Sequence, residues 1–231
     1  MIRILETYFL LFLFYSTCGW LVETVGEFFK SRKIVNRGFL IGPYCPIYGY
    51  GVILITLLLS KYKDDIFLTF ILAMVISGIL EYLTSYLMEK IFHARWWDYT
   101  RLRFNINGRI CLETLILFGL AGPITLCLIN PVIVSGINFI PEIPLHILAG
   151  FVFIMFVIDN IVSLNVIMSF KNATRELKDN TEEITQKVRE IISKRSFLGR
   201  RLVNAFPTLD AIRYKIKEKI ENRTEFISNQ K

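Results

Sequence analysis

The sequence predicts an all-α, polytopic membrane protein: a bundle of five transmembrane helices followed by a helical cytoplasmic C-terminal tail. Of its 231 residues, 53% are hydrophobic and 20% are charged, and the mean hydropathy is +0.47. The hydrophobic share exceeds the range that is usual for soluble domains. Several apolar stretches are also long enough to cross about 30 Å of hydrocarbon. The charged residues gather between these stretches and after the last of them.

Five apolar stretches make up the predicted bundle, which takes residues 1–170. They are residues 8–29, 44–60, 66–88, 110–130 and 145–170. The second is the shortest, because a segment rich in glycine and proline, residues 37–51, overlaps its start. Proline has no backbone N–H and glycine adds backbone freedom, so both disfavour a helix there. We therefore predict irregular backbone at the rim of the bundle, which membrane proteins tolerate only where protein buries it or it lines a wet cavity.

The connections between the stretches predict an orientation. Lysine and arginine are concentrated in the first connection, in the third connection and in the tail, whereas the second is balanced and the fourth has none. Positive connections stay on the cytoplasmic side of a membrane. An odd number of spans then places the N-terminus outside and the C-terminus in the cytoplasm of a multi-pass protein of the cell membrane.

Residues 171–231 form the predicted tail. They carry 15 basic and 9 acidic residues, against 12 and 11 in residues 1–170. Because the two signs alternate, the tail does not predict nucleic-acid binding, whereas attraction to anionic lipid headgroups fits it. Apolar residues recur at helical spacing, namely Leu177, Thr181, Ile184, Val188 and Ile191. The tail is either a surface for the inner leaflet or a partner, or a helical cover for the bundle.

The first four spans suggest an internal repeat. Gly19 precedes Glu23 by one helical turn, and Ser77 precedes Glu81 in the same way. The second span opens with GPYC at residues 42–45 and the fourth with GRIC at residues 108–111. Such a pattern fits either a parallel duplication of a two-helix unit, as in some transporters, or chance.

Acidic residues inside the apolar spans are the main functional candidates. An ionisable group at mid-span costs about 2.5–3.5 kcal/mol on the insertion scale, so its presence points to a role. Glu23 and Glu27 share one face of the first span, and Glu81 and Glu89 share one face of the third. The predicted orientation places all four in the cytoplasmic half. We expect a polar chamber there, in which carboxylates bind a cation or a proton and Arg109 faces an anionic group.

A structural reading of the same residues stays open. Glu27 and Glu89 would then simply lie at the membrane interface. Glu23 and Glu81 would pair with Arg37 or Arg109, which lowers the cost of burial and fixes the packing of the helices without any substrate. Asp159 is a further ionisable residue within the fifth span.

The third connection and the glycine- and proline-rich segment supply the other candidates. Residues 95–100, RWWDYT, have the aromatic and basic character of a belt at headgroup level. The predicted binding residues are, in full, Glu23, Arg37, Pro43, Cys45, Glu81, Trp97, Asp98, Asn107 and Arg109. No catalytic residue is predicted, because the sequence has no Walker loop, HExxH, catalytic triad or dinucleotide fingerprint. No cofactor and no metal are expected, since the four cysteines and two histidines lack the spacing of a zinc site.

Four stretches carry a resemblance to a known family. They are residues 37–49, RGFLIGPYCPIYG; 81–85, EYLTS; 95–99, RWWDY; and 108–111, GRIC; together with Gly19, Trp20 and Glu23. Over residues 8–125 the chain resembles the CmpB-type ABC-transporter permeases, small bacterial membrane proteins with distant animal relatives of similar layout. The resemblance implies an integral membrane protein filed as a permease, and it implies neither a substrate nor catalytic residues.

Three hypotheses follow. The leading one is a transporter whose site for a small solute or a lipid headgroup is formed by Glu23, Glu81, Asn107, Arg109 and the irregular backbone. The second is a membrane enzyme acting on a lipid or polyprenyl headgroup, with a glutamate as general base and Arg109 as phosphate clamp. The third is a non-catalytic scaffold whose tail recruits a partner. The expected partners are membrane lipids and a second copy of the chain or a separate ATPase subunit.

Overall fold

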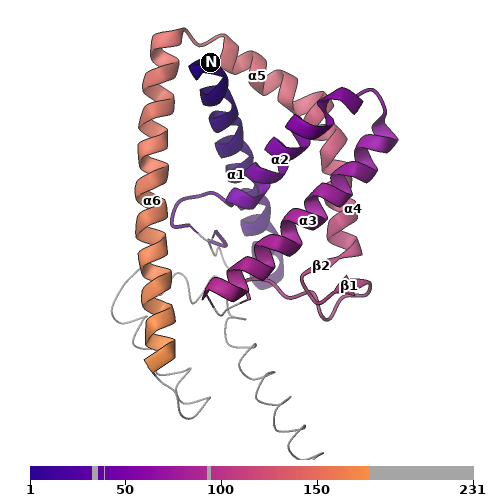
Figure 1. Cartoon of the computed structure of the whole chain (residues 1–231), viewed down its shortest axis with the longest axis vertical. Helices are drawn as coiled ribbons and strands as arrows, with labels where there is room; N and C mark the ends of the chain where they lie inside the picture. The colour runs from indigo at the N-terminus through magenta and orange to yellow at the C-terminus, as the bar shows by residue number, and fades with distance from the viewer. Residues whose placement is uncertain (33–35, 39, 93–94, 177–231) are drawn as a thin grey trace, which may run out of the picture.

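The computed structural model describes residues 1–32, 36–38, 40–92 and 95–176, and these are mostly helical (Figure 1). The elements in order are α1 (Ile2–Ser31), α2 (Pro46–Leu59), η1 (Ser60–Tyr62), α3 (Ile66–Phe92), β1 (Asn105–Ile106), β2 (Ile110–Cys111), α4 (Leu112–Pro123), η2 (Ile124–Ile129), α5 (Asn130–Asn138) and α6 (Glu142–Glu176). α6 continues past the predicted boundary at residue 170. The predicted tail from residue 177 onward lies outside the described residues.

Four helical stretches are long and apolar enough to cross a membrane. They are Ile2–Phe29, Ile66–Phe92, Leu112–Asn138 and Glu142–Asn165, whereas the second predicted span is a shorter apolar helix, Pro46–Tyr62. At 1.5 Å per residue, the 14 residues of α2 are about 21 Å long. α2 is short because Pro46 is at its first turn and Cys45 before it is extended. Proline fits the first turn of a helix, and its ring prevents the helix from starting earlier.

The bundle contains two helical hairpins, α1–α2 and α3–α4, which pack through small residues. A Cβ atom on Gly49 of α2 would lie 2.5 Å from the Phe12 carbonyl oxygen of α1. In the second hairpin, a Cβ atom on Gly122 of α4 would lie 2.4 Å from the Cβ atom of Ala73 on α3. Such close approaches between helices are typical of membrane interiors, where small residues let backbones pack tightly. Both second helices begin at a cysteine, since Cys45 and Cys111 are the N-caps of α2 and α4.

The third membrane-length stretch, Leu112–Asn138, is bent (Figure 1) and is held by a buried polar network. Its middle part, η2, is a π-helix, which follows Pro123 and precedes Asn130. The Tyr15 hydroxyl of α1 donates to Asn130 Oδ1 at 2.7 Å, and Asn130 Nδ2 donates to Thr56 Oγ1 of α2 at 2.8 Å. These bonds satisfy polar groups that would be costly in hydrocarbon. The network therefore fixes the bend against the first hairpin.

Figure 1 shows how the ends of the bundle are arranged. The N-terminus, the α2–α3 turn and the α5–α6 turn lie at the upper end. The β1–β2 hairpin, the final turn of α3 and the far end of α6 lie at the lower end. The third connection, which the sequence predicts to be cytoplasmic, and the end of α6 that precedes the predicted tail thus lie at the same end of the described part of the molecule. α6 reaches this end along α1, which it contacts through Phe9 and Phe153, with ring centroids 5.4 Å apart.

Candidate functional site

The first hairpin positions Glu23 through a tyrosine. Gly19 lies one turn before Glu23 on α1, and a Cβ atom there would lie 2.2 Å from the Tyr48 ring. Because Gly19 has no side chain, the ring of Tyr48 rests directly on α1. The Tyr48 hydroxyl then donates a 2.7 Å hydrogen bond to Glu23 Oε1. At the start of α2, the Cys45 N–H donates to the Ser16 carbonyl of α1 at 2.8 Å, which fixes where Tyr48 lies.

The second hairpin and the third connection position Glu81. This residue is 6% exposed, and the Tyr99 hydroxyl donates to its Oε1 at 3.0 Å. Its other oxygen, Oε2, is buried and has no hydrogen-bond partner among the described residues. Thr114, at the start of α4, donates its hydroxyl proton to the Cys111 carbonyl at 3.0 Å. Glu81 is therefore a deeply buried carboxyl group with one oxygen left without a donor.

Glu23 and Glu81 come from different helices, and they are near enough for their charges to interact. The charges of both also act on Tyr99. Burial, followed by these two charges, raises the pKa of the Tyr99 hydroxyl well above its usual value. Tyr99 therefore keeps its proton and remains a hydrogen-bond donor to Glu81. We call Glu23, Tyr48, Glu81 and Tyr99 the carboxylate–tyrosine cluster.

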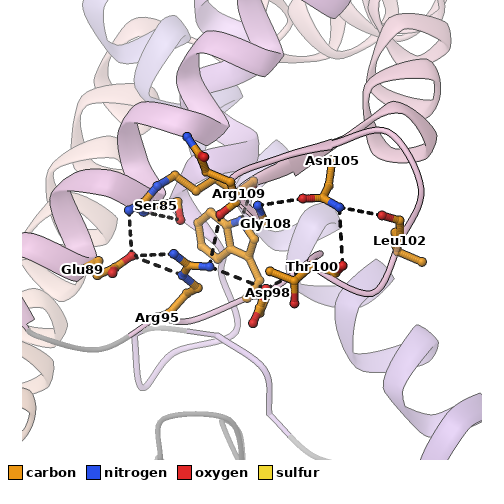
Figure 2. Close-up of polar contacts among 11 residues, drawn as sticks. Ser85, Glu89, Arg95, Asp98, Thr100, Leu102, Asn105, Gly108 and Arg109 are labelled. Atoms are coloured by element: carbon orange, nitrogen blue, oxygen red, sulfur yellow. Dashed lines mark hydrogen bonds and ion pairs between the residues drawn. The ribbon is translucent and has the colours of Figure 1, made fainter. Parts of the chain in front are cut away.

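The arginines form a separate network on Glu89, two turns beyond Glu81 on α3 (Figure 2). Arg109 Nη2 lies 2.8 Å and Arg95 Nη2 lies 3.2 Å from Glu89 Oε2. Arg109 Nη1 also donates to Ser85 Oγ at 3.3 Å, and its guanidinium lies 5.5 Å from the centre of the Tyr86 ring. Arg109 is thus held by Glu89 and not by Glu81. Glu89, which the structural reading of the sequence places simply at the membrane interface, is an ion-pair partner.

Three other predicted binding residues fold the third connection. Trp97 Nε1 donates to the Arg109 carbonyl at 3.0 Å, and Asp98 Oδ1 accepts from the Thr100 N–H at 2.9 Å (Figure 2). Asn107 has a positive φ of 53° and, with Gly108, makes the turn of the β1–β2 hairpin. Positive φ at both positions is what an Asn-Gly hairpin turn requires. The exposed Asn107 donates to the Tyr82 hydroxyl at 3.0 Å and does not join the cluster.

Arg37 pairs with a glutamate other than Glu23. Its Nη1 lies 2.8 Å from Glu27 Oε2, and both side chains are about a quarter exposed. Within the described ranges, Glu23 and Glu81 have no lysine or arginine partner. The predicted pairing of Glu23 and Glu81 with these arginines is therefore wrong, because Arg37 and Arg109 pair with Glu27 and Glu89 instead.

The irregular segment before α2 is attached to α6. The Gly42 N–H donates to Asp159 Oδ2 at 3.1 Å, and the Ile41 N–H donates to Ser163 Oγ at 3.0 Å. Pro43 is exposed and Cys45 is 8% exposed. The sequence marks Asp159 only as an ionisable residue of the fifth span. Its partners are backbone N–H groups of an irregular segment, and no sequence pattern marks such bonds.

The described residues offer little to a metal ion. Among them, no three His, Cys, Asp or Glu side chains gather in a way that would hold one. The cluster brings together two carboxyl groups and two phenolic hydroxyls from α1, α2, α3 and the third connection. Such a set can accept hydrogen bonds, bind a cationic group or bind a proton.

Comparison with known proteins places the chain in a family. A family model, ABC_trans_CmpB, described as "Putative ABC-transporter type IV", matches residues 10–164, which is more than half of the chain. The comparisons with curated proteins and with solved structures gave no match. The family match and the four membrane-length helices fit a multi-pass, transporter-like membrane protein. The chain therefore belongs to the ABC_trans_CmpB family, which confirms the resemblance carried by its sequence motifs.

Proposed function

We propose that this protein is a transporter-type membrane component and that the carboxylate–tyrosine cluster is its polar binding site. One observation carries the proposal. Glu23 and Glu81, on different helices, interact through their charges although neither has a basic partner among the described residues. Acidic groups inside a membrane protein are costly, and those without a structural ion pair are typical of ion or substrate pathways.

The nearby ion pairs support this division of roles. Arg37 with Glu27, and Arg109 with Glu89, join each loop to the helix before it. These pairs give Glu27 and Glu89 a structural role. Glu23 and Glu81 are then the candidates for a functional role. Arg109 would have to leave Glu89 to clamp a lipid phosphate, so the enzyme hypothesis has less support than the transporter hypothesis.

The proposed orientation has the cluster near the cytoplasmic face. The third connection, which is rich in arginine, contains Tyr99 of the cluster, and such connections remain cytoplasmic. Fusions at the C-terminus test this. A green fluorescent protein should fluoresce there and an alkaline phosphatase should be inactive; the reverse result would contradict the orientation.

A separate ATPase subunit is the partner that the family description suggests. We propose it because the sequence itself has no nucleotide-binding motif.

Solute exchange in proteoliposomes tests the transport proposal. The purified full-length protein is screened by thermal shift against cationic, neutral and anionic solutes, and the solutes that stabilise it are tested for exchange. We expect Glu23→Gln and Glu81→Gln to abolish both stabilisation and exchange. The matched control is Glu113→Gln, which neutralises an exposed carboxylate in the first turn of α4. Normal exchange by both cluster variants would overturn the proposed site.

A further inference from the structure

Glu81 Oε2 is the most unusual polar atom of the cluster. It exposes less than 1 Å² of surface and has no hydrogen-bond partner among the described residues, while Oε1 accepts from Tyr99. Burying an ionised carboxylate without compensation is far more costly than burying a neutral carboxyl group. The environment of this oxygen therefore suits a bound proton better than a negative charge.

Glu23 adds a second acidic group beside Glu81. Its charge acts on Glu81, and Tyr48 donates to its Oε1 at 2.7 Å. A neighbouring negative charge disfavours the ionised form of a carboxyl group. Glu23 is partly exposed and Glu81 is buried, so the geometry assigns the proton to Glu81.

The remaining groups near the pair do not supply positive charge. The titratable groups are Tyr48 from α2, Cys45 just before α2, Tyr99 from the third connection and Cys111 at the start of α4. All of these are neutral or negative. The nearby arginines, Arg37, Arg95 and Arg109, are engaged by Glu27 and Glu89. Thr114 is close enough to interact with the Glu81 carboxyl group, but its hydroxyl proton is donated to the Cys111 carbonyl and is therefore not offered to Oε2.

We propose that the ligand of the carboxylate–tyrosine cluster is a proton, which Glu81 binds at Oε2 and which the charge of Glu23 helps to retain. A proton needs no cavity beside the atom that binds it, in keeping with the buried position of Oε2. Tyr99 stays bonded to Oε1 in both states and orients the carboxyl group. Coupling of this proton to solute movement rests on the proposed function. The proton site itself does not depend on it.

Infrared difference spectroscopy of the purified full-length protein tests the proton site. Spectra recorded between mildly acidic and alkaline pH should contain the carbonyl band of a protonated carboxyl group, which disappears as the pH rises. We expect Glu81→Gln to remove this band and Glu23→Gln to shift its loss to lower pH, because the like charge is gone. Glu113→Gln, which alters an exposed carboxylate, should leave both unchanged.

Two results would overturn the proton site. One is a band that is absent from the native protein or unaffected by Glu81→Gln. The other is loss of the band on addition of sodium or potassium at constant pH, since the ligand would then be an alkali ion. The spectra do not require transport. A Glu81 band without solute exchange would keep the proton site and overturn the proposed function, and exchange without the band would do the opposite.

Discussion

The Tyr48 hydroxyl donates a 2.7 Å hydrogen bond to Glu23 Oε1, and the Tyr48 ring rests on α1 at Gly19, one turn before that glutamate. One residue without a side chain thus brings a phenol from α2 to an acidic group on α1. The bond joins the two helices of the first hairpin at the level of the cluster.

Tyr48→Phe removes the hydroxyl and keeps the ring on Gly19. We expect a loss of about 1 kcal/mol in the free energy of unfolding, because hydrogen bonds between membrane helices are modest in strength. Unfolding by sodium dodecyl sulfate in mixed micelles measures it. Tyr50→Phe is the matched control: Tyr50 is two residues away, is 55% exposed and packs its ring on Phe12. An equal loss in both variants would contradict a role for the Tyr48–Glu23 bond.

Gly49→Ala should destabilise the first hairpin. The new Cβ atom would lie 2.5 Å from the Phe12 carbonyl oxygen, which is backbone and cannot move aside. Overpacking of this kind costs about 1–3 kcal/mol. Gly51→Ala, in the same helix, is the control, since its nearest contact would be an ordinary 3.6 Å from Leu80. Thermal unfolding of the two purified variants should show a lower midpoint for Gly49→Ala alone.

Glu89→Gln should loosen the third connection. The substitution leaves Arg109, which is 9% exposed, and Arg95 without their shared carboxylate. We expect a loss of about 1–3 kcal/mol, below the value for a fully buried pair because the Glu89 side chain is 25% exposed. Thermal unfolding measures it, with Glu113→Gln as the exposed control. Hydrogen exchange should also quicken in residues 95–111, and unchanged exchange there would argue against the anchoring role.

Asp159→Ala should release the irregular segment from α6. The substitution removes the acceptor of the Gly42 N–H, and Tyr44 loses its interaction with the same carboxylate. Cys45, which is 8% exposed, should then react faster with a maleimide in a variant whose other three cysteines are replaced by serine. The control is Asn160→Ala, since the Asn160 amide donates within its own helix, to the Phe156 carbonyl. Equal reaction rates in the two variants would show that Asp159 does not hold the segment.

Local patterns predicted most of the helices. Long apolar runs require internally bonded backbone in a membrane, so composition alone indicated α1, α3, α6 and the stretch from α4 to α5. The sequence also predicted the irregular segment before α2, because proline and glycine act on the backbone locally. The sequence also predicted that this stretch is the shortest, but it placed the start of the helix two residues too early. Residues 44 and 45 are apolar and extend the run in the sequence, yet Pro46 starts the helix after them.

For the candidate site, sequence identified the acidic residues and could not assign their partners. The sequence shows four glutamates as charges within apolar runs, namely Glu23, Glu27, Glu81 and Glu89. Whether Arg109 pairs with Glu81 or with Glu89 depends on how the β1–β2 hairpin folds back on α3, which is a matter of tertiary contact. The same holds for the bond between Gly42 and Asp159, which are 117 residues apart.

The sequence by itself determined the membrane class, the family and the identity of the acidic residues, because hydropathy, proline and buried charge act through composition and local geometry. Only the tertiary structure decided which glutamates are neutralised by arginine and which are left with tyrosine. Ion pairing depends on distances of a few ångströms between different helices, and these distances are set by close packing at residues such as Gly19 and Gly49.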